Sequence, residues 1–257
     1  MSAPVALITG ASRGIGKRIA IDLAESGYDL VLTARSSKKT PGRLPGTLED
    51  TATQVENWGR KALVSPLDVR DECAIASLAE QVDKVFGRCD LLVNNAALAP
   101  PKPALQDSTK RWRMAIDANI NGPFYISYYF VPLLEKNGLG RIVNISSQAA
   151  TMPDFQRISY TTTKAALEGM TRAMAFDLKG SVAVNCIRLE IPVWTEGFAA
   201  TLPPESALGF EHPVIMSDAV RWLAESPITF TGRVLTIGDL RARGAVRPFT
   251  PASIKDL

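Results

Sequence analysis

A tyrosine and a lysine four residues apart, Tyr160 and Lys164 in the segment YTTTK, could carry out proton-transfer chemistry. On a helix, this spacing places both side chains on one face, one turn apart. A phenol titrates at about 10, and a neighbouring ammonium favours the phenolate form. Such a pair can pass a proton to or from an alcohol or carbonyl oxygen. The same spacing also arises by chance on many helices, so the pair alone does not establish a site.

A serine, Ser147, follows a predicted strand over residues 141–146 and precedes the tyrosine. Its hydroxyl could hold a substrate oxygen, although a serine at a strand end is often only a cap or turn residue. The single histidine, His212, leaves little scope for histidine-based catalysis. Three widely spaced cysteines show no metal-ligand spacing, and we expect buried thiols in a reducing compartment and no bound metal.

Three glycines in the segment TGASRGIG lie between an apolar run and an amphipathic one. Residues 5–9 predict a buried strand, and apolar residues then recur at helical spacing until Gly27. A strand, a glycine turn and a helix N-terminus together present free backbone N–H groups to a phosphate. The spacing is Gly-x-x-x-Gly-x-Gly, which excludes the P-loop pattern and differs from Gly-x-Gly-x-x-Gly. An ordinary glycine turn is the alternative interpretation.

The composition is that of an ordinary globular protein. The 257 residues are 46% hydrophobic and 21% charged, with a net charge of +3 that is too small to predict nucleic-acid binding. No apolar run approaches the roughly 18 residues that a membrane helix needs, and the N-terminus does not resemble a signal peptide. We therefore expect a cytoplasmic protein without a membrane or nucleic-acid partner.

Predicted strands and helices alternate along the chain. This alternation predicts an α/β fold with a doubly wound parallel sheet, in one domain over residues 1–257. Two segments are predicted loops: residues 36–48, and residues 192–213 within a substrate loop near 190–216. The predicted strands cover residues 5–9, 30–34, 61–69, 90–94, 141–146, 182–188 and 233–238, and the predicted helices cover 51–58, 71–86, 109–134, 160–178 and 217–224.

Taken together, these motifs resemble the short-chain dehydrogenases/reductases, from about Pro4 to Gly238. TGASRGIG matches the family's cofactor turn, NNAA at 94–97 its Asn-Asn-Ala-Gly motif, and TGRVLTIG its final strand. PLDVRD resembles the segment that holds the adenine. Asn119, Ser147, Tyr160 and Lys164 match the catalytic tetrad in order and spacing.

The resemblance implies a Rossmann fold and a reaction that interconverts a carbonyl and an alcohol by hydride transfer with a nicotinamide cofactor. Tyr160 would transfer the proton, Ser147 would fix the substrate oxygen, and Asn119 would anchor a water that relays protons to Lys164. Lys164 would also hold the nicotinamide ribose. The implied cofactor-binding residues are Gly10, Ser12, Arg13, Gly14, Ile15, Gly16, Arg35, Ser36, Asp68, Val69, Asn95, Ala96, Ala97, Tyr160, Lys164, Pro192 and Thr195.

The sequence departs from the family pattern at two points. Ala97 stands in place of the last glycine of the Asn-Asn-Ala-Gly motif. Leu189 and Glu190 stand where relatives carry the Pro-Gly that clasps the nicotinamide, so Pro192 and Thr195 would take over that contact. Around the loop after the second strand, the chain is also similar to hydroxysteroid-dehydrogenase-like members, which identifies no substrate.

The end of the second predicted strand favours NADP(H) over NAD(H). By alignment with relatives, Ala34 replaces the carboxylate that would bind a free ribose 2′-hydroxyl. Arg35 and Arg13 supply guanidiniums that can bind a 2′-phosphate, and Ser36 to Lys38 can add further contacts. A solvated basic loop is the alternative interpretation. The family also implies a homodimer or homotetramer.

Loop aromatics predict an apolar pocket for a small carbonyl or alcohol substrate. The alternative is that these side chains pack on the protein's own core. The predicted walls of this pocket are Met152, Phe155, Trp194 and Phe198, with Ala97 and Leu98 opposite.

A catalytically inactive dinucleotide-binding protein remains the second functional hypothesis, and sugar epimerase chemistry is a third.

Overall fold

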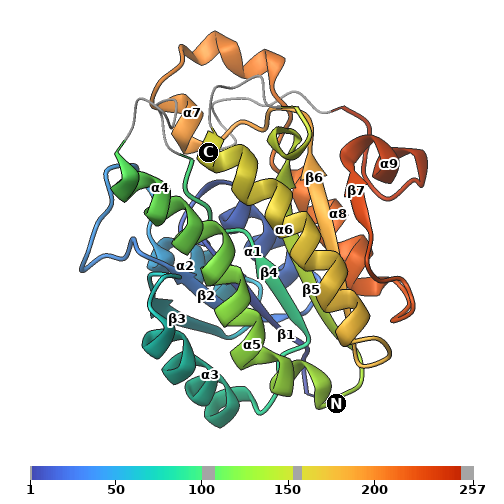
Figure 1. The fold of residues 1–257 in the computed structure, drawn as a ribbon. Helices are drawn as coiled ribbons and strands as arrows, with labels where there is room; N and C mark the ends of the chain where they lie inside the picture. Colours follow the sequence, from blue (N-terminus) through green and yellow to red (C-terminus); the bar gives the residue numbers. More distant parts are fainter. Residues whose placement is uncertain (1, 100–107, 153–157, 250–257) are drawn as a thin grey trace.

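Seven parallel strands form one sheet in the order β3-β2-β1-β4-β5-β6-β7. The fold is seen in a computed structural model, which describes residues 2–99, 108–152 and 158–249 (Figure 1). The order confirms the predicted doubly wound α/β topology. The strands are β1 (Val5–Thr9), β2 (Asp29–Ala34), β3 (Ala62–Pro66), β4 (Leu91–Asn94), β5 (Gly140–Ser147), β6 (Val182–Leu189) and β7 (Val234–Thr236).

Burial on both faces of the sheet explains why the strands are apolar runs. All five residues of β1 and all four of β4 are buried. Two strands are shorter than predicted by several residues, and β4 begins one residue later than predicted, at Leu91. The strand expected over 61–69 ends at Pro66, because residues 68–71 form a turn in which Asp71 N–H donates to the Asp68 carbonyl. The strand expected over 233–238 ends at Thr236, whose hydroxyl caps the next helix.

Two hydrophobic cores lie on opposite faces of the sheet. Helices α1, α2 and α8 pack on one face through residues such as Ile19, Val55 and Val220. Helices α3, α5 and α6 cover the other face through residues such as Ile75 and Phe130; α5 and α6 lie in front of the sheet in Figure 1. The helices are α1 (Gly14–Glu25), α2 (Leu48–Asn57), α3 (Glu72–Phe86), α4 (Thr109–Ile116), α5 (Gly122–Glu135), α6 (Ile158–Asp177), α7 (Glu196–Ala199), α8 (Val214–Glu225) and α9 (Ile237–Ala242).

The helix predicted over 109–134 is divided by a π-helical turn at Asp117–Asn121, which separates α4 from α5. Directly after this turn, Gly122 lies so close to Val69 that an added Cβ would stand 2.9 Å from the Val69 carbonyl oxygen. Such π turns often mark functional sites. Here the wider turn contains Asn119, one of the predicted catalytic residues.

The predicted loop over 192–213 contains two short helices, α7 and the 3-10 helix Pro204–Gly209. Its two ends are joined by hydrogen bonds from Trp194 N–H to the Glu211 carbonyl (3.0 Å) and from Glu211 N–H to the Pro192 carbonyl (2.9 Å). The loop therefore closes at its base, and α7 lies beyond the carboxyl ends of the strands, at the top of Figure 1.

The crossover point of the sheet lies between β1 and β4, which are paired although β2 and β3 separate them in the chain. In an open α/β sheet, ligands bind beyond the carboxyl ends of the strands at this point. Across the described ranges, we find no helix with the length and apolar character needed to cross a lipid bilayer.

Candidate active site and cofactor site

The glycine turn joins β1 to α1 and needs its glycines for different reasons. Gly10 and Gly14 have φ values of +70° and +56°, a conformation that other residues rarely adopt. Gly16 is required by space, because an added Cβ would lie 2.3 Å from the Gly10 carbonyl oxygen. The turn thus brings the start of α1 against the end of β1.

The NNAA motif is bound directly to this turn. Asn95 Nδ2 donates to the Thr9 carbonyl oxygen at 2.8 Å, and the backbone N–H groups of Asn95 and Ala96 donate to Thr9 Oγ1 at 3.0 and 2.9 Å. These bonds lock the carboxyl ends of β1 and β4 together. Two motifs separated by more than eighty residues in the chain therefore form one continuous surface at the carboxyl ends of β1 and β4, which we call the floor of the site.

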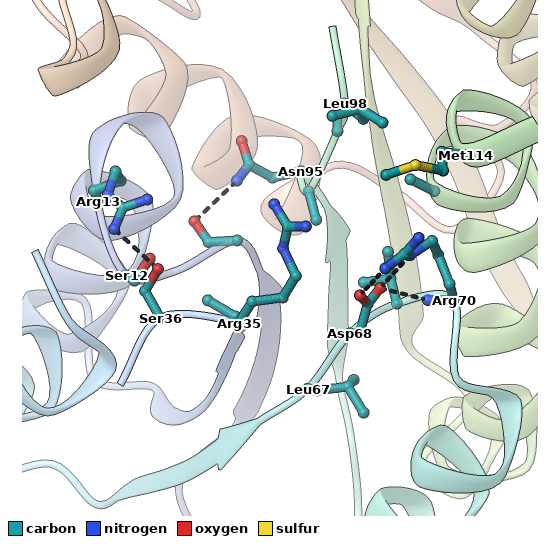
Figure 2. A pocket seen from close by; sticks show the side chains of 16 residues that line it. Ser12, Arg13, Arg35, Ser36, Leu67, Asp68, Arg70, Asn95, Leu98 and Met114 are labelled. Atoms are coloured by element: carbon teal, nitrogen blue, oxygen red, sulfur yellow. Dashed lines mark hydrogen bonds and ion pairs between the residues drawn. The ribbon is translucent and has the colours of Figure 1, made fainter. Parts of the chain in front are cut away.

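A pocket of about 300 Å³ opens at this floor (Figure 2). Ten of the 17 predicted cofactor residues line it, and seven do not. The seven are Gly14, Ile15, Gly16, Tyr160, Lys164, Pro192 and Thr195. The predicted residues along the pocket are Gly10, Ser12, Arg13, Arg35, Ser36, Asp68, Val69, Asn95, Ala96 and Ala97, joined by Ala34, Leu67, Arg70, Leu98, Met114 and Ala118.

The two arginines expected to bind a 2′-phosphate have different surroundings. Arg13 donates to the carbonyl oxygens of residues 44, 45 and 46 at 2.8–3.1 Å and to Ser36 Oγ at 3.0 Å. Its guanidinium therefore fixes the predicted loop over 36–48. Arg35 is exposed, its side chain lies in the pocket in Figure 2, and it has no bonded partner in the described part of the chain.

Asp68, expected at the adenine, is paired with Arg70. Arg70 Nε and Nη2 donate to the two Asp68 carboxylate oxygens at 2.9 and 2.6 Å, as Figure 2 shows. These hydrogen bonds lower the pKa of the Asp68 carboxyl below its usual value, and the charge of Arg35 lowers it further. Arg70 is a site residue that was not predicted, although its place two residues after Asp68 in PLDVRD is visible in the sequence.

Tyr160 and Lys164 lie one turn apart in the first half of α6, as predicted. Lys164 is buried, and its Nζ donates to the Ile145 carbonyl oxygen in β5 at 2.7 Å. The same Nζ lies 5.5 Å from the centre of the Tyr160 ring. The ammonium is therefore held at a fixed position between β5 and the phenol ring.

Ser147 and Asn119 approach the same end of the sheet. Ser147 is the last residue of β5, two residues after the carbonyl that holds Lys164, and its Oγ accepts from Ala149 N–H at 3.3 Å. Asn119 is buried and donates to Thr163 Oγ1 on α6 at 3.0 Å. Asn119 also binds both backbone groups of Leu98, at 2.7 and 2.9 Å, so it joins α6 to the segment after β4.

An ion pair between buried Glu168 and partly buried Arg188 supports this part of α6. Glu168, one turn after Lys164, accepts from Arg188 Nε and Nη2 at 2.8 and 2.6 Å and from Ser146 Oγ at 2.9 Å. It therefore ties α6 to β5 and β6 where both strands approach their carboxyl ends. This pair was not predicted, since the partners lie 20 residues apart in the chain and belong to no recognisable motif.

The start of α7 lies directly on the glycine turn. Glu196 Oε2 accepts a hydrogen bond from Gly14 N–H at 2.7 Å, and Thr195 Cγ2 lies 3.2 Å from the position that a Cβ on Gly14 would take. Thr195 is therefore near the cofactor turn, as the sequence analysis expected. Pro192 instead closes the base of the loop, and Glu196 was not considered.

The expected pocket walls are only partly realised. Trp194 is fully buried and packs edge-on against Phe210, with ring centres 5.2 Å apart. The expectation that it lines a substrate pocket is wrong, because the loop folds back on itself. Met152 and Phe198 are exposed, Leu98 and Ala97 border the cofactor pocket, and residue 155 lies outside the described residues.

The residues at this edge of the sheet fit an adenosine phosphate. An exposed guanidinium, a buried serine and a carboxylate line the pocket beside backbone groups of residues 95–97. At the glycine turn, an anion already accepts from the Gly14 N–H, which is the interaction that a phosphate would make.

The comparisons with known proteins establish the family. A family model described as short chain dehydrogenase matches residues 4–199. The chain belongs to the short-chain dehydrogenase/reductase family of oxidoreductases, whose members bind nicotinamide dinucleotides. This confirms the resemblance seen in the sequence.

Two relatives carry the name that the sequence analysis anticipated. The chain is 32% identical over 250 residues to hydroxysteroid dehydrogenase-like protein 2 of Homo sapiens, covering 96% of this chain and 60% of that protein. The protein of that name from Danio rerio is 32% identical over 244 residues, covering 94% and 59%. This chain thus spans about 60% of the length of these relatives.

Two crystal structures show the same fold. A short chain dehydrogenase from Mycobacterium thermoresistibile is 25% identical with a TM-score of 0.87, covering 97% of this chain and 92% of that one. A short chain dehydrogenase from Mycobacterium paratuberculosis bound to NAD is 27% identical with a TM-score of 0.80, covering 92% and 96%.

Proposed function

We propose that this protein is an NADP(H)-preferring oxidoreductase that interconverts a ketone or aldehyde and an alcohol. The observation that carries the proposal is the arrangement around Lys164. Its ammonium donates to the Ile145 carbonyl oxygen and lies beside the Tyr160 ring. Ile145 stands two residues before Ser147 in β5. This arrangement lies at the carboxyl end of β5, the end of a parallel strand at which ligands bind in open α/β sheets.

A bound nicotinamide dinucleotide supplies or accepts the hydride. Tyr160 gives a proton to the substrate oxygen in reduction and takes it back in oxidation. Ser147 holds that oxygen by a hydrogen bond. Lys164 keeps a positive charge beside the phenol and binds the ribose, and Asn119 fixes the segment at Leu98 that borders the cleft.

Arg35 supports the preference for NADP(H). Its guanidinium has no bonded partner among the described residues and lies in the pocket, at the end of β2. Ala34 beside it offers no carboxylate to repel a 2′-phosphate. Ser36, buried next to the pocket, offers a hydroxyl that is already oriented by Arg13.

An apolar substrate is supported by the exposed side chains near α6 and α7. Met152 follows the strand that ends at Ser147 and is 49% exposed, and Phe198 on α7 is 40% exposed. Exposed apolar side chains beside a polar reaction centre favour bulky ketones or aldehydes over small charged ones.

A homodimer or homotetramer is supported by the outer surface of α5 and α6. Phe124, Tyr128 and Phe176 are 48%, 64% and 80% exposed there, which is unusual for large apolar side chains. Phe124 and Tyr128 stack with ring centres 6.3 Å apart. A second copy of the chain can bury this surface.

The variant Tyr160→Phe tests the proposed reaction. We expect kcat to fall by about a thousandfold, because general acid–base catalysis contributes roughly 10²–10⁴. The Kd for NADPH should stay nearly unchanged, since the phosphates are expected at the glycine turn and not at the phenol oxygen. Turnover is followed at the nicotinamide absorbance with a panel of bulky apolar and small charged carbonyl compounds.

The control Tyr128→Phe removes an exposed phenol from α5 and should leave kcat unchanged. Lys164→Ala should weaken both turnover and cofactor binding, because one side chain serves both. Wild-type kcat in Tyr160→Phe on a substrate found in the panel would refute the proposed role of the phenol.

A further inference from the structure

Glu196 is a buried carboxylate in contact with the turn that begins α1. Its Oε2 accepts from Gly14 N–H at 2.7 Å across 182 residues of sequence, and the residue is only 7% exposed. Gly14 is the first residue of α1. Burying a carboxylate is unfavourable unless it is hydrogen-bonded or paired, so this contact must offset the loss of hydration.

The first turn of α1 supplies no anion of its own. Within the described chain, α1 carries no acidic residue in its first turn, and its N-cap residue, Arg13, makes no side-chain capping bond. Unpaired N–H groups and the helix dipole make such a terminus attract negative charge. Glu196 therefore provides the charge that a bound phosphate would otherwise provide.

We propose that Glu196 is a built-in competitor of the cofactor phosphates and thereby a latch on the substrate loop. The inference rests on the proposed function, because it requires a dinucleotide at the glycine turn. A carboxylate and a phosphate cannot both accept from the Gly14 N–H, and their like charges repel at this distance. Cofactor binding displaces Glu196 and releases the start of α7.

The latch links the cofactor site to the substrate side of the cleft. Glu196 begins α7, and Phe198 on the same short helix packs against Phe210 with ring centres 4.9 Å apart. The base of the loop stays anchored by the hydrogen bonds between Trp194 and Glu211 and by the buried Trp194 ring. Release of Glu196 therefore moves α7 while the base holds, so substrate binds after the cofactor.

The variants Glu196→Gln and Glu196→Ala test this inference through binding. Titration with NADPH, followed by nicotinamide fluorescence and calorimetry, should give a Kd lower by about tenfold, since charge-assisted hydrogen bonds have this magnitude. Adenosine 2′-monophosphate, which lacks the pyrophosphate, should bind all variants equally. The control Glu205→Gln removes an exposed charge from the same loop and should leave both affinities unchanged.

Hydrogen exchange in the cofactor-free protein gives a second readout. The Gly14 amide should be protected in the wild type and exchange faster in Glu196→Ala, while circular dichroism shows both folded. If the wild type binds NADPH and Glu196→Ala binds it no more tightly, the latch is wrong and the proposed function stands. If no form binds NADPH or NADH, the proposed function fails and the latch fails with it.

Discussion

Replacing Arg35 with alanine should remove most of the preference for NADPH over NADH. The Arg35 guanidinium lies in the pocket without a bonded partner in the described chain, so its hydrogen-bonding capacity is available to a 2′-phosphate. One charge-assisted hydrogen bond contributes about 1.5–3 kcal/mol, and each 1.4 kcal/mol is about tenfold in Kd. Because Arg35 is exposed, solvent and salt screening favour the lower value, about tenfold.

The measurement compares NADPH and NADH Kd values in the wild type, in Arg35→Ala and in Lys39→Ala. Lys39 is exposed in the same loop and does not line the pocket, so its variant has the same charge change at a different place. We expect Arg35→Ala to weaken NADPH about tenfold and to leave NADH nearly unchanged. Adding Ala34→Asp should then favour NADH, because a carboxylate at the end of β2 binds the free 2′-hydroxyl.

Raising the ionic strength should lower the ratio of the NADH Kd to the NADPH Kd in the wild type, since exposed charges are screened over about 10 Å at 0.1 M salt. Equal Kd values for NADPH and NADH in the wild type would refute the assigned cofactor. An equal loss of NADPH affinity in Lys39→Ala would show that only the overall charge of the loop matters.

Two further predictions concern stability and thiol reactivity. Glu168→Ala should lower the free energy of unfolding by about 3 kcal/mol in a denaturant titration, because it leaves Arg188 without its bidentate partner; an unchanged midpoint would contradict this role. Burial raises the pKa of the Cys89 and Cys186 thiols to about 12, so iodoacetamide at about pH 8 should alkylate exposed Cys73 alone until denaturant is added, as mass spectrometry of peptides would show.

Much of the fold could be predicted because it depends on local patterns. Continuous apolar runs identified the central strands, and β1 matches its predicted range of 5–9. The predicted strand ends were less accurate where a turn or a helix cap ends the strand. At Thr236, the hydroxyl accepts from Asp239 N–H and caps α9, so β7 ends there. The division of the predicted helix over 109–134 also escaped the sequence, because a π turn keeps helical periodicity on both sides.

The candidate site could be predicted in its residues but not in its contacts. TGASRGIG, NNAA and YTTTK are short segments whose chemistry is carried by residue type and spacing, so the sequence alone determined the glycine turn, the Tyr160–Lys164 pair and the family. Residue type cannot specify a bonding partner that lies far away in the chain.

Only the tertiary structure decided how the charged side chains are used. Arg13 is bound to carbonyls more than 30 residues away and Glu196 to Gly14 across 182 residues, whereas Arg35 is left available. The Trp194 side chain is buried against Phe210 of its own loop, although that loop lies beside the cleft. Loop conformation fixes these choices, because hydrogen bonds form only between groups that the fold brings within about 3 Å in the right direction.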